Sequence, residues 1–301
     1  MNQTPPLCSF NLRRSVLSVP AINLRALEKS HSLDCDAVIL DLEDSVAPEK
    51  KAEARENLRR FFAGPPLEGK ERIIRINSLS SEFGAADLDL VTALLPDAVL
   101  LPKVDDPRDV TDISDLLADA DVPEELRIWA MIETPRGVLN VGAIAETGRT
   151  PTSRLDCLVV GLNDLRKETG VLPQPGRSFL VPWLMQVILA VKAYGLDALD
   201  SVFNDFQDAE GFDVECGQGR AMGFAGKMLI HPGQIAAANR HFGPSAEEIA
   251  EAQAIISAFA DPAAEGLNVI NADGRMIERL HLVQAEALVH KARLISARKP
   301  A

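Results

Sequence analysis

The sequence contains few aromatic residues and few cysteines, and it has no long hydrophobic run. Aromatic residues make up 5% of the 301 residues and only one is tyrosine, so the core must be built mainly from leucine, valine, isoleucine and alanine. The cysteines form no CxxC pair and neither HxH nor HExxH occurs, which argues against a zinc site. No apolar run reaches membrane-spanning length, and residues 1–15 lack the hydrophobic stretch of a signal peptide. We therefore expect a cytoplasmic protein with no membrane partner.

Positive charge is also scarce. The formal net charge is −13, and lysine and arginine form no long basic run. Binding to a nucleic-acid backbone needs clustered cations, so we expect no nucleic-acid partner. A small anionic substrate needs only a few local cations and is compatible with this charge.

Short apolar runs recur along the chain, and each ends in polar or turn residues. Most are apolar at consecutive positions, as strands buried on both faces are. The runs cover residues 15–20, 37–44, 72–77, 98–104, 127–134, 157–164, 196–203 and 226–232. Helix-patterned stretches lie between them, including 23–33, 48–62 and 183–195.

Strands that alternate with helices predict right-handed βαβ crossovers and a parallel sheet. Eight such units predict an α/β fold of the closed (β/α)8 TIM type. An open doubly wound sheet is the alternative, but no GxGxxG motif follows the first run. We expect the barrel to form a catalytic domain over residues 1–235, followed by a C-terminal extension over residues 236–301.

The pattern of the extension is helical with one hairpin. Ser245 and Glu248 form a capping-box pattern ahead of an apolar-periodic helix. Asp273 and Gly274 stand between apolar residues, as in a β-hairpin, and a last helix follows at about 278–297. A barrel does not need this extension, for which a lid and a subunit contact are the two interpretations.

Polar side chains follow five successive apolar runs at almost even spacing. Each would lie at the carboxyl end of its strand, and in a barrel these ends converge on the face where active sites lie. The residues are Asp44, Arg75, Lys103, Glu133 and Asp164, separated by 31, 28, 30 and 31 residues. This spacing, about one βα unit per step, predicts that three acids and two cations share one site.

Glu133 and Asp164 are the candidate metal ligands. Two carboxylates together with water and substrate oxygens suit Mg²⁺, which seldom receives an all-protein cage. In the alternative interpretation, Asp164 caps the following helix and Glu133 pairs with Arg75 or Lys103.

Arg75 is a candidate for binding a carboxylate or thioester oxygen with its fork of donors, and a structural ion pair is the alternative. For Lys103 we favour charge balance over Schiff-base chemistry, because neighbouring acids keep its amine protonated. Glu43 and Asp44 follow one strand directly, and neighbours on a strand point to opposite faces. We expect them to accept hydrogen bonds from metal-bound water and from Arg75 or Lys103, with helix capping as the alternative. Asp44 is also counted among the catalytic candidates.

Several other polar residues have weaker assignments. His231 precedes a proline, and we favour a loop anchor over a general base. Arg14, Arg25 and Lys29 lie near the first strand and helix, where they would hold a phosphate or remain solvated. The run "KKAEAR" (50–55) predicts a solvated helix face.

Seven segments, in order, resemble the citrate lyase β-subunit / malyl-CoA lyase family within the wider HpcH/HpaI aldolase superfamily. They span about residues 13 to 240 and are "RRSVLSVPAINLRALEKS", "DAVILDLEDSVAPEKKAEAR", "RIIRINSL", "DAVLLPKV", "MIETPRGVLN", "LVVGLNDL" and "GFAGKMLIHPGQI". The resemblance implies a TIM-type barrel, a Mg²⁺ ion, a CoA thioester substrate, and a homotrimer or a dimer of trimers.

By motif position, the resemblance makes Glu133 and Asp164 the metal ligands and Arg75 a substrate-binding residue. Glu133 is expected to contact the substrate as well. The backbone after Gly161, with Asn163, would hold the carboxylate of the small acid. The cations near the first helix, Arg14 and Lys29 among them, would approach the phosphates of CoA.

The sequence departs from the family pattern at three places. Ala21 stands where the family usually has glycine. Glu278, one methylene longer, stands where the family's C-terminal acid, usually aspartate, reaches into the site of a neighbouring subunit. Arg166 adds a cation near the substrate and would favour an additional carboxylate.

The resemblance implies metal-assisted cleavage of a 3-hydroxyacyl-CoA, of the citryl-, citramalyl- or malyl-CoA type, to acetyl-CoA and a 2-keto acid. In this mechanism Arg75 stabilises the enolate oxygen and Glu278 protonates the enolate carbon. The alternatives are a thioesterase or a malate-synthase-like condensing enzyme on the same scaffold, and a non-catalytic scaffold subunit. A CoA-free pyruvate aldolase is a weaker alternative.

Overall fold

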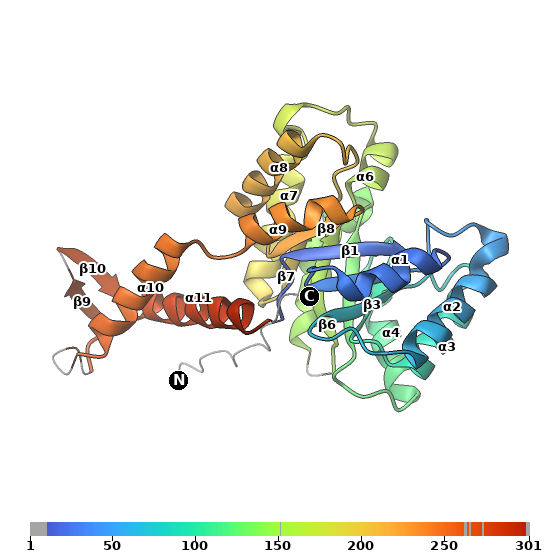
Figure 1. The fold of residues 1–301 in the computed structure, drawn as a ribbon, viewed down its shortest axis with the longest axis horizontal. Helices are drawn as coiled ribbons and strands as arrows, with labels where there is room; N and C mark the ends of the chain where they lie inside the picture. The colour runs from blue at the N-terminus through green and yellow to red at the C-terminus, as the bar shows by residue number, and fades with distance from the viewer. Residues whose placement is uncertain (1–10, 151, 262–263, 265, 273, 299–301) are drawn as a thin grey trace. The chain divides into compact units, whose positions relative to one another are not determined.

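Eight parallel strands close into a barrel in sequence order, with β1 paired to β8 (Figure 1). The computed structural model describes residues 11–150, 152–261, 264, 266–272 and 274–298. The strands are β1 (Ser15–Pro20), β2 (Ala37–Asp41), β3 (Glu71–Arg75), β4 (Ala98–Leu101), β5 (Arg127–Ile132), β6 (Leu155–Val160), β7 (Asp197–Asp200) and β8 (Gly226–Leu229). The predicted (β/α)8 TIM-type barrel is confirmed.

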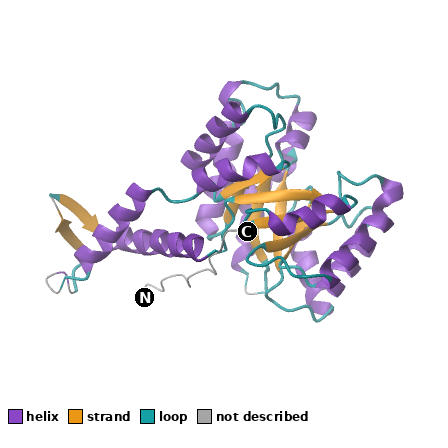
Figure 2. Cartoon of the chain, in the orientation of Figure 1, coloured by secondary structure: helices purple, strands orange, loops and turns teal. Residues whose placement is uncertain are grey.

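Helices surround the strands, as Figure 2 shows. One helix follows each of the first five strands, and two helices separate β6 from β7. They are α1 (Leu24–Lys29), α2 (Lys51–Ala63), α3 (Gly84–Leu94), α4 (Pro107–Asp119), α5 (Pro135–Glu146), α6 (Leu162–Thr169), α7 (Val181–Tyr194), α8 (Ala209–Met222) and α9 (Ile235–Phe242). Within the described ranges, no helix is both long and apolar enough to cross a membrane.

Alternate residues of each strand point into the barrel, because neighbours on a strand face opposite sides. The inward residues form one apolar cluster: Val16, Ala37, Ile39, Ile73, Ala98, Leu100, Trp129, Met131, Cys157, Val159, Leu199 and Met228. The outward residues pack under the helices in a larger core rich in leucine, valine and isoleucine. The same alternation places Asp41, Arg75 and Glu133 beyond the inward cluster, at the carboxyl end of the barrel.

The residues from Gly243 onward belong to a second compact unit, whereas the barrel unit runs from Arg13 to Phe242. The predicted capping box is present: the Ser245 hydroxyl accepts the Glu248 N–H at 3.1 Å, and Glu248 accepts the Ser245 N–H at 2.8 Å. Helix α10 (Ala246–Phe259) packs against α11 (Arg279–Ala297), and β9 (Val269–Ala272) pairs with β10 (Arg275–Glu278) in an antiparallel hairpin.

The predicted extension of helices and a hairpin is thus confirmed as a structure, while Asp273 lies outside the described residues. The division into a catalytic domain and an accessory extension, with its lid and subunit-contact interpretations, stays a prediction.

A buried arginine joins three strands at the amino end of the barrel. Arg13 is 3% exposed and donates from Nε and Nη2 to Glu71 at 2.8 Å each. It also donates to Asp197 at 3.0 Å and contacts Asp156. Its guanidinium lies 4.8 Å from the ring centroid of Trp129. One cation is therefore the shared counter-charge of three acids, on β3, β6 and β7, at the floor of the barrel.

Replacing Arg13 by alanine should lower the free energy of unfolding by about 3 kcal/mol, because three neighbouring carboxylates lose their counter-charge. Urea denaturation measures this change. Arg72→Ala is the matched control, since the Arg72–Asp97 pair (3.0 Å) is partly exposed and should contribute less than about 1 kcal/mol. Equal losses in the two variants would contradict the assigned role of Arg13.

Candidate active site

A cavity of about 340 Å³ opens at the carboxyl ends of the barrel strands. One side carries charged residues at or just after the ends of β2, β3, β5 and β6: Asp41, Asp44, Arg75, Glu133 and Asp164. The other side is neutral and includes Ser18, Ser201, Val202, Met228 and Ile230. The cavity occupies the face of the barrel where active sites of this fold lie.

Arg75 is fixed by a carboxylate to which the sequence analysis assigns no role. Its Nε and Nη2 donate to the two oxygens of Asp41 at 2.6 Å each, and Nη1 lies 3.1 Å from Glu43 Oε2. Burial opposes the charge of Asp41, but the hydrogen bonds and charge of Arg75 lower its pKa below the usual value. A guanidinium has five N–H donors, and Nη1 also contacts Met131 Sδ at 3.9 Å, so these contacts leave one Nη2 hydrogen for a substrate oxygen in the cavity that Arg75 lines.

The alternation of inward- and outward-facing residues along the strand identifies Asp41 as a residue of the site. Asp41 stands two residues after the inward-facing Ile39, and the sheet register pairs it with Arg75. The run 37–44 predicts a strand that ends at Glu43 and Asp44, but β2 ends at Asp41 and the chain then turns.

That turn brings both acids toward the cations. Glu43 is 7% exposed and lies 3.0 Å from Lys103 Nζ, in addition to its contact with Arg75. Burial and the charge of Asp44 raise the pKa of Glu43, whereas Arg75 and Lys103 oppose the rise. Asp44 is exposed, lines the cavity, and lies 4.0 Å from Lys103 Nζ. Its catalytic assignment stays a prediction.

Glu133 is buried at the end of β5, and its Oε1 accepts the backbone N–H of Lys103 at 2.9 Å. Burial raises the pKa of Glu133 to about 7, and the neighbouring Glu43 adds to the rise against the charges of Arg75 and Lys103. A Cβ atom at Gly161 would lie 2.5 Å from Glu133 Cβ and Oε2. Glycine at 161 therefore makes the space in which the Glu133 carboxylate sits.

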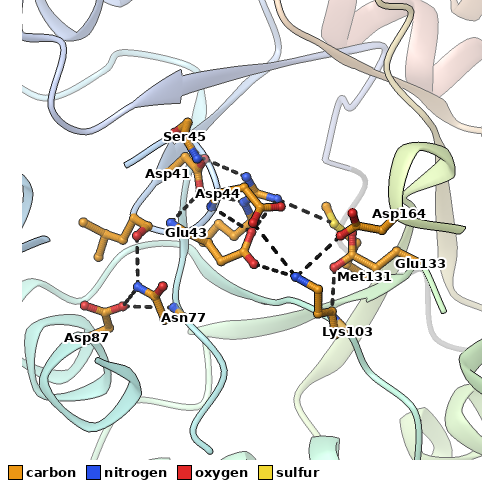
Figure 3. Close-up of polar contacts among 12 residues, drawn as sticks. Asp41, Glu43, Asp44, Ser45, Asn77, Asp87, Lys103, Met131, Glu133 and Asp164 are labelled. Atoms are coloured by element: carbon orange, nitrogen blue, oxygen red, sulfur yellow. Dashed lines mark hydrogen bonds and ion pairs between the residues drawn. The ribbon is translucent and has the colours of Figure 1, made fainter. Parts of the chain in front are cut away.

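Asp164 reaches the same cavity from the first turn of α6. Its Oδ2 lies 3.5 Å from Lys103 Nζ. Lys103 thus contacts both candidate metal ligands, Glu133 through its main chain and Asp164 through its ammonium group (Figure 3). The backbone of Lys103 has φ 51°, a left-handed conformation that is costly for lysine and that aims its N–H at Glu133.

The donor set fits a hard divalent cation. Five carboxylates (Asp41, Glu43, Asp44, Glu133 and Asp164) face two cations (Arg75 and Lys103), an excess of three negative charges when all are ionised. In the described part of the chain, no three or more histidine, cysteine, aspartate or glutamate side chains are grouped to hold a metal ion by themselves. Two carboxylates completed by water and substrate oxygens are the arrangement that Mg²⁺ prefers.

The start of α6 also presents backbone donors. The Leu162 N–H donates to Ser201 Oγ at 3.0 Å. The next amides, of Asn163 and Asp164, lie in the first turn, where N–H groups have no acceptor within the helix. The Asn163 and Asn204 side-chain amides pair reciprocally at 3.2 and 2.8 Å. The binding of a substrate carboxylate by the amides beyond Gly161 stays a prediction.

Arg14 does not lie in this site. It precedes β1 at the amino end of the barrel, where it is buried and pairs with both oxygens of Asp36 at 2.8 Å. The expected contact of Arg14 with substrate phosphates is wrong, because the guanidinium is enclosed at the opposite end from the cavity. Lys29 is exposed on α1 and does not line the cavity.

The other assigned residues are placed as follows. His231 is exposed, accepts the Gly233 N–H at 3.1 Å and stacks on Phe206, as a loop anchor does. Arg166 is half-buried on α6 and does not line the cavity. Glu278 is exposed in the second unit, where its N–H donates to His281 at 2.9 Å, and its role from another subunit stays a prediction.

One prediction for the "KKAEAR" run is wrong. Lys51 is 5% exposed, and its ammonium donates to the carbonyl oxygens of Leu42 and Glu43 and to Asn77 Oδ1, at 2.7 to 2.8 Å. It holds the turn after β2, on which Glu43 and Asp44 stand.

Mg²⁺ binding should depend on pH through Glu133. Because its pKa is about 7, protons compete with the cation below that pH, and the apparent affinity should be about tenfold weaker at pH 6 than at pH 8. Isothermal titration calorimetry at both pH values measures this. Glu133→Gln should bind Mg²⁺ weakly at both, without the pH dependence.

The raised pKa of Glu133 should also change folding stability with pH, in the direction opposite to its effect on Mg²⁺ binding. A raised carboxyl pKa favours the folded state at low pH, so this contribution is lost as pH rises from about 4.5 to 7. The difference in unfolding free energy between the native protein and Glu133→Gln should change across that window. A constant difference would show that Glu133 ionises normally.

Comparisons with known proteins agree with this geometry. The family model described as HpcH/HpaI aldolase/citrate lyase matches residues 14–232. The chain is 41% identical to a (3S)-malyl-CoA thioesterase of Cereibacter sphaeroides, covering 94% of this chain and 96% of the relative. It is 35% identical to the mitochondrial citramalyl-CoA lyase of Mus musculus, covering 92% and 85% of the two chains.

It is also 31% identical to citrate lyase subunit beta of Escherichia coli, covering 95% of each. Among solved structures, protein CitE from Mycobacterium tuberculosis, in complex with magnesium, acetoacetate and coenzyme A, is similar with a TM-score of 0.73 and 27% identity. That similarity covers 93% of this chain and 97% of CitE.

Proposed function

Because the chain belongs to the HpcH/HpaI aldolase/citrate lyase family, we propose that it is a Mg²⁺-dependent enzyme acting on the CoA thioester of a short 3-hydroxy acid. The resemblance expected from the sequence is confirmed at the level of the family. The observation that carries the proposal is one cavity in which a fixed guanidinium, Arg75, shares the space with the two carboxylates Glu133 and Asp164.

In the proposed reaction the substrate hydroxyl gives its proton to a carboxylate of the cavity, for which Asp44 is the candidate, and the C–C bond next to the hydroxyl carbon breaks to give a 2-keto acid and the enolate of acetyl-CoA. Mg²⁺ held by Glu133 and Asp164 would supply a Lewis acid for the oxygens of the small acid. The amides of Asn163 and Asp164 would bind the acid's carboxylate. These contacts place the hydroxyl carbon on the side of the cavity next to Glu133.

Arg75 then stabilises negative charge on the thioester oxygen as the bond breaks. It is suited to this role because Asp41 holds it in one orientation before the substrate binds, so no reorganisation is needed when the charge develops. In this proposal Glu278 of another subunit donates the proton that turns the enolate into acetyl-CoA.

Thioester hydrolysis is the second candidate, and the 41% identity to a (3S)-malyl-CoA thioesterase favours it. In hydrolysis, water attacks the thioester carbonyl and the C–S bond breaks, releasing the free hydroxy acid and CoA. Arg75 would serve both reactions, since each places negative charge on the same thioester oxygen.

Product analysis separates the two. Purified protein is incubated with citryl-, citramalyl- and malyl-CoA, with and without Mg²⁺, and the products are identified by mass spectrometry. Acetyl-CoA with a keto acid supports C–C cleavage, and CoA with the intact hydroxy acid supports hydrolysis. No turnover of any thioester, together with no Mg²⁺ binding, would favour the non-catalytic scaffold.

Arg75→Lys should lower kcat/KM at least 100-fold, about 3 kcal/mol of barrier, because lysine keeps the charge but loses the paired geometry. Steady-state kinetics with the best thioester measures this. Arg72→Lys, on the outer face of the same strand, is the control and should keep normal turnover. Near-normal activity of Arg75→Lys would exclude the oxyanion role.

A further inference from the structure

Four charged side chains form a buried cluster outside the cavity, where β7 and β8 meet α8. Asp200 and Lys227 are both 0% exposed, and Lys227 Nζ lies 3.0 Å from Asp200 Oδ2. Lys227 also donates to Glu215 at 2.8 Å, and Arg177 Nη1 donates to Asp200 Oδ1 at 2.7 Å. The cluster balances two cations with two carboxylates.

This cluster is costly to maintain. Buried ion pairs often add no stability over apolar residues of similar size. The backbone of Arg177 has φ 55°, and its Nη2 is buried with no hydrogen-bond partner in the described part of the chain. Such a cluster holds its side chains, and the main chain next to them, in one geometry.

Asp200 does not reach the cavity itself. It ends β7 one residue after the inward-facing Leu199, so its side chain points away from the barrel interior. Its effect passes through the next residue: Asp200 Oδ1 accepts the N–H of Ser201 at 2.8 Å. The charge cluster thus holds the main chain where β7 enters the active-site face.

Ser201 links the cluster to α6 through a hydrogen bond. Its hydroxyl is buried and accepts the N–H of Leu162 at 3.0 Å. Leu162 begins α6, two residues before the candidate metal ligand Asp164. The reciprocal amide pair of Asn163 and Asn204 is a second link between the same two segments.

We propose that Asp200 and Ser201 are positioning residues for the first turn of α6: the buried ion cluster fixes Ser201, and Ser201 fixes the turn that carries Asp164 and the free amides. The inference rests on the proposed function where it concerns Mg²⁺ binding. Neither residue supplies a metal ligand in this proposal.

Two measurements test the proposal on Ser201→Ala. Mg²⁺ affinity, from calorimetry at pH 8, should fall about tenfold, as outer-shell substitutions do in metal sites. Amide hydrogen exchange at Leu162 and Leu165 should become faster without metal, because Leu162 loses its acceptor and the turn that the Leu165 N–H closes onto Gly161 loosens. Ser201→Thr keeps the hydroxyl and should restore both values, and Asp200→Asn should change them in the same direction as Ser201→Ala.

Asp36→Asn is the matched control. Asp36 is also a buried aspartate paired with an arginine, but it lies at the amino end of the barrel. It should lower stability and leave the Mg²⁺ affinity and the exchange at Leu162 and Leu165 unchanged. Asn204→Ala, at an exposed position, should speed exchange at Leu162 and Leu165 because α6 loses its second link, and it provides a test that does not depend on the folding of the buried variants.

Normal exchange at these two amides in Ser201→Ala and Asn204→Ala would overturn the proposal. It would also be overturned if Asp36→Asn weakened Mg²⁺ binding as much as Asp200→Asn, since the effect would then be general destabilisation. Absence of Mg²⁺ binding by the native protein would instead refute the proposed function, and the exchange data would still decide the positioning role.

Discussion

The pairing of Arg75 with Asp41 is the interaction on which the carboxyl end of the barrel depends. Both groups point inward from adjacent strands, and each would be costly to bury alone. Their two hydrogen bonds at 2.6 Å hold the guanidinium in one orientation. Glu43 and Glu133 gather around that fixed positive charge, which opposes the rise that burial causes in the pKa of both carboxyl groups.

The other carboxylates crowd the same site, and their negative charge is only partly balanced by the cations there. Lys103 compensates for part of the excess, with its ammonium within 4.0 Å of Glu43, Asp44 and Asp164. Burial is the largest cause of the raised pKa of Glu133, and the charge of Glu43 adds to the rise. A divalent cation bound between Glu133 and Asp164 would relieve this repulsion, so the same excess that destabilises the ionised site favours metal binding.

The fold and the charged half of the site follow from the sequence because they depend on local patterns. Continuous apolar runs and even spacing place Arg75, Lys103 and Glu133 at strand ends. Asp41 can be predicted to face the barrel interior only when the end of β2 is known, because that end decides which residues of the strand point inward. The apolar stem of Lys51 packs within the protein while its ammonium finds two carbonyl oxygens, which a helical charge pattern does not reveal. Arg14 precedes the run 15–20, so the strand direction alone places it at the amino end of the barrel, away from the cavity.

Ser201 shows a further limit of local patterns. Its hydroxyl serves an amide 39 residues earlier in the chain, and the ion cluster that holds it combines residues from a loop, two strands and a helix. Such a cluster adds little to stability and so leaves no hydrophobic or helical signal in the sequence. Glu133 directly follows β5 and is buried, whereas Asp164 lies on an eight-residue helix. In the proposed site a metal ion between them requires that helix to keep its place, and the hydrogen bonds from the segment after β7 would provide the constraint.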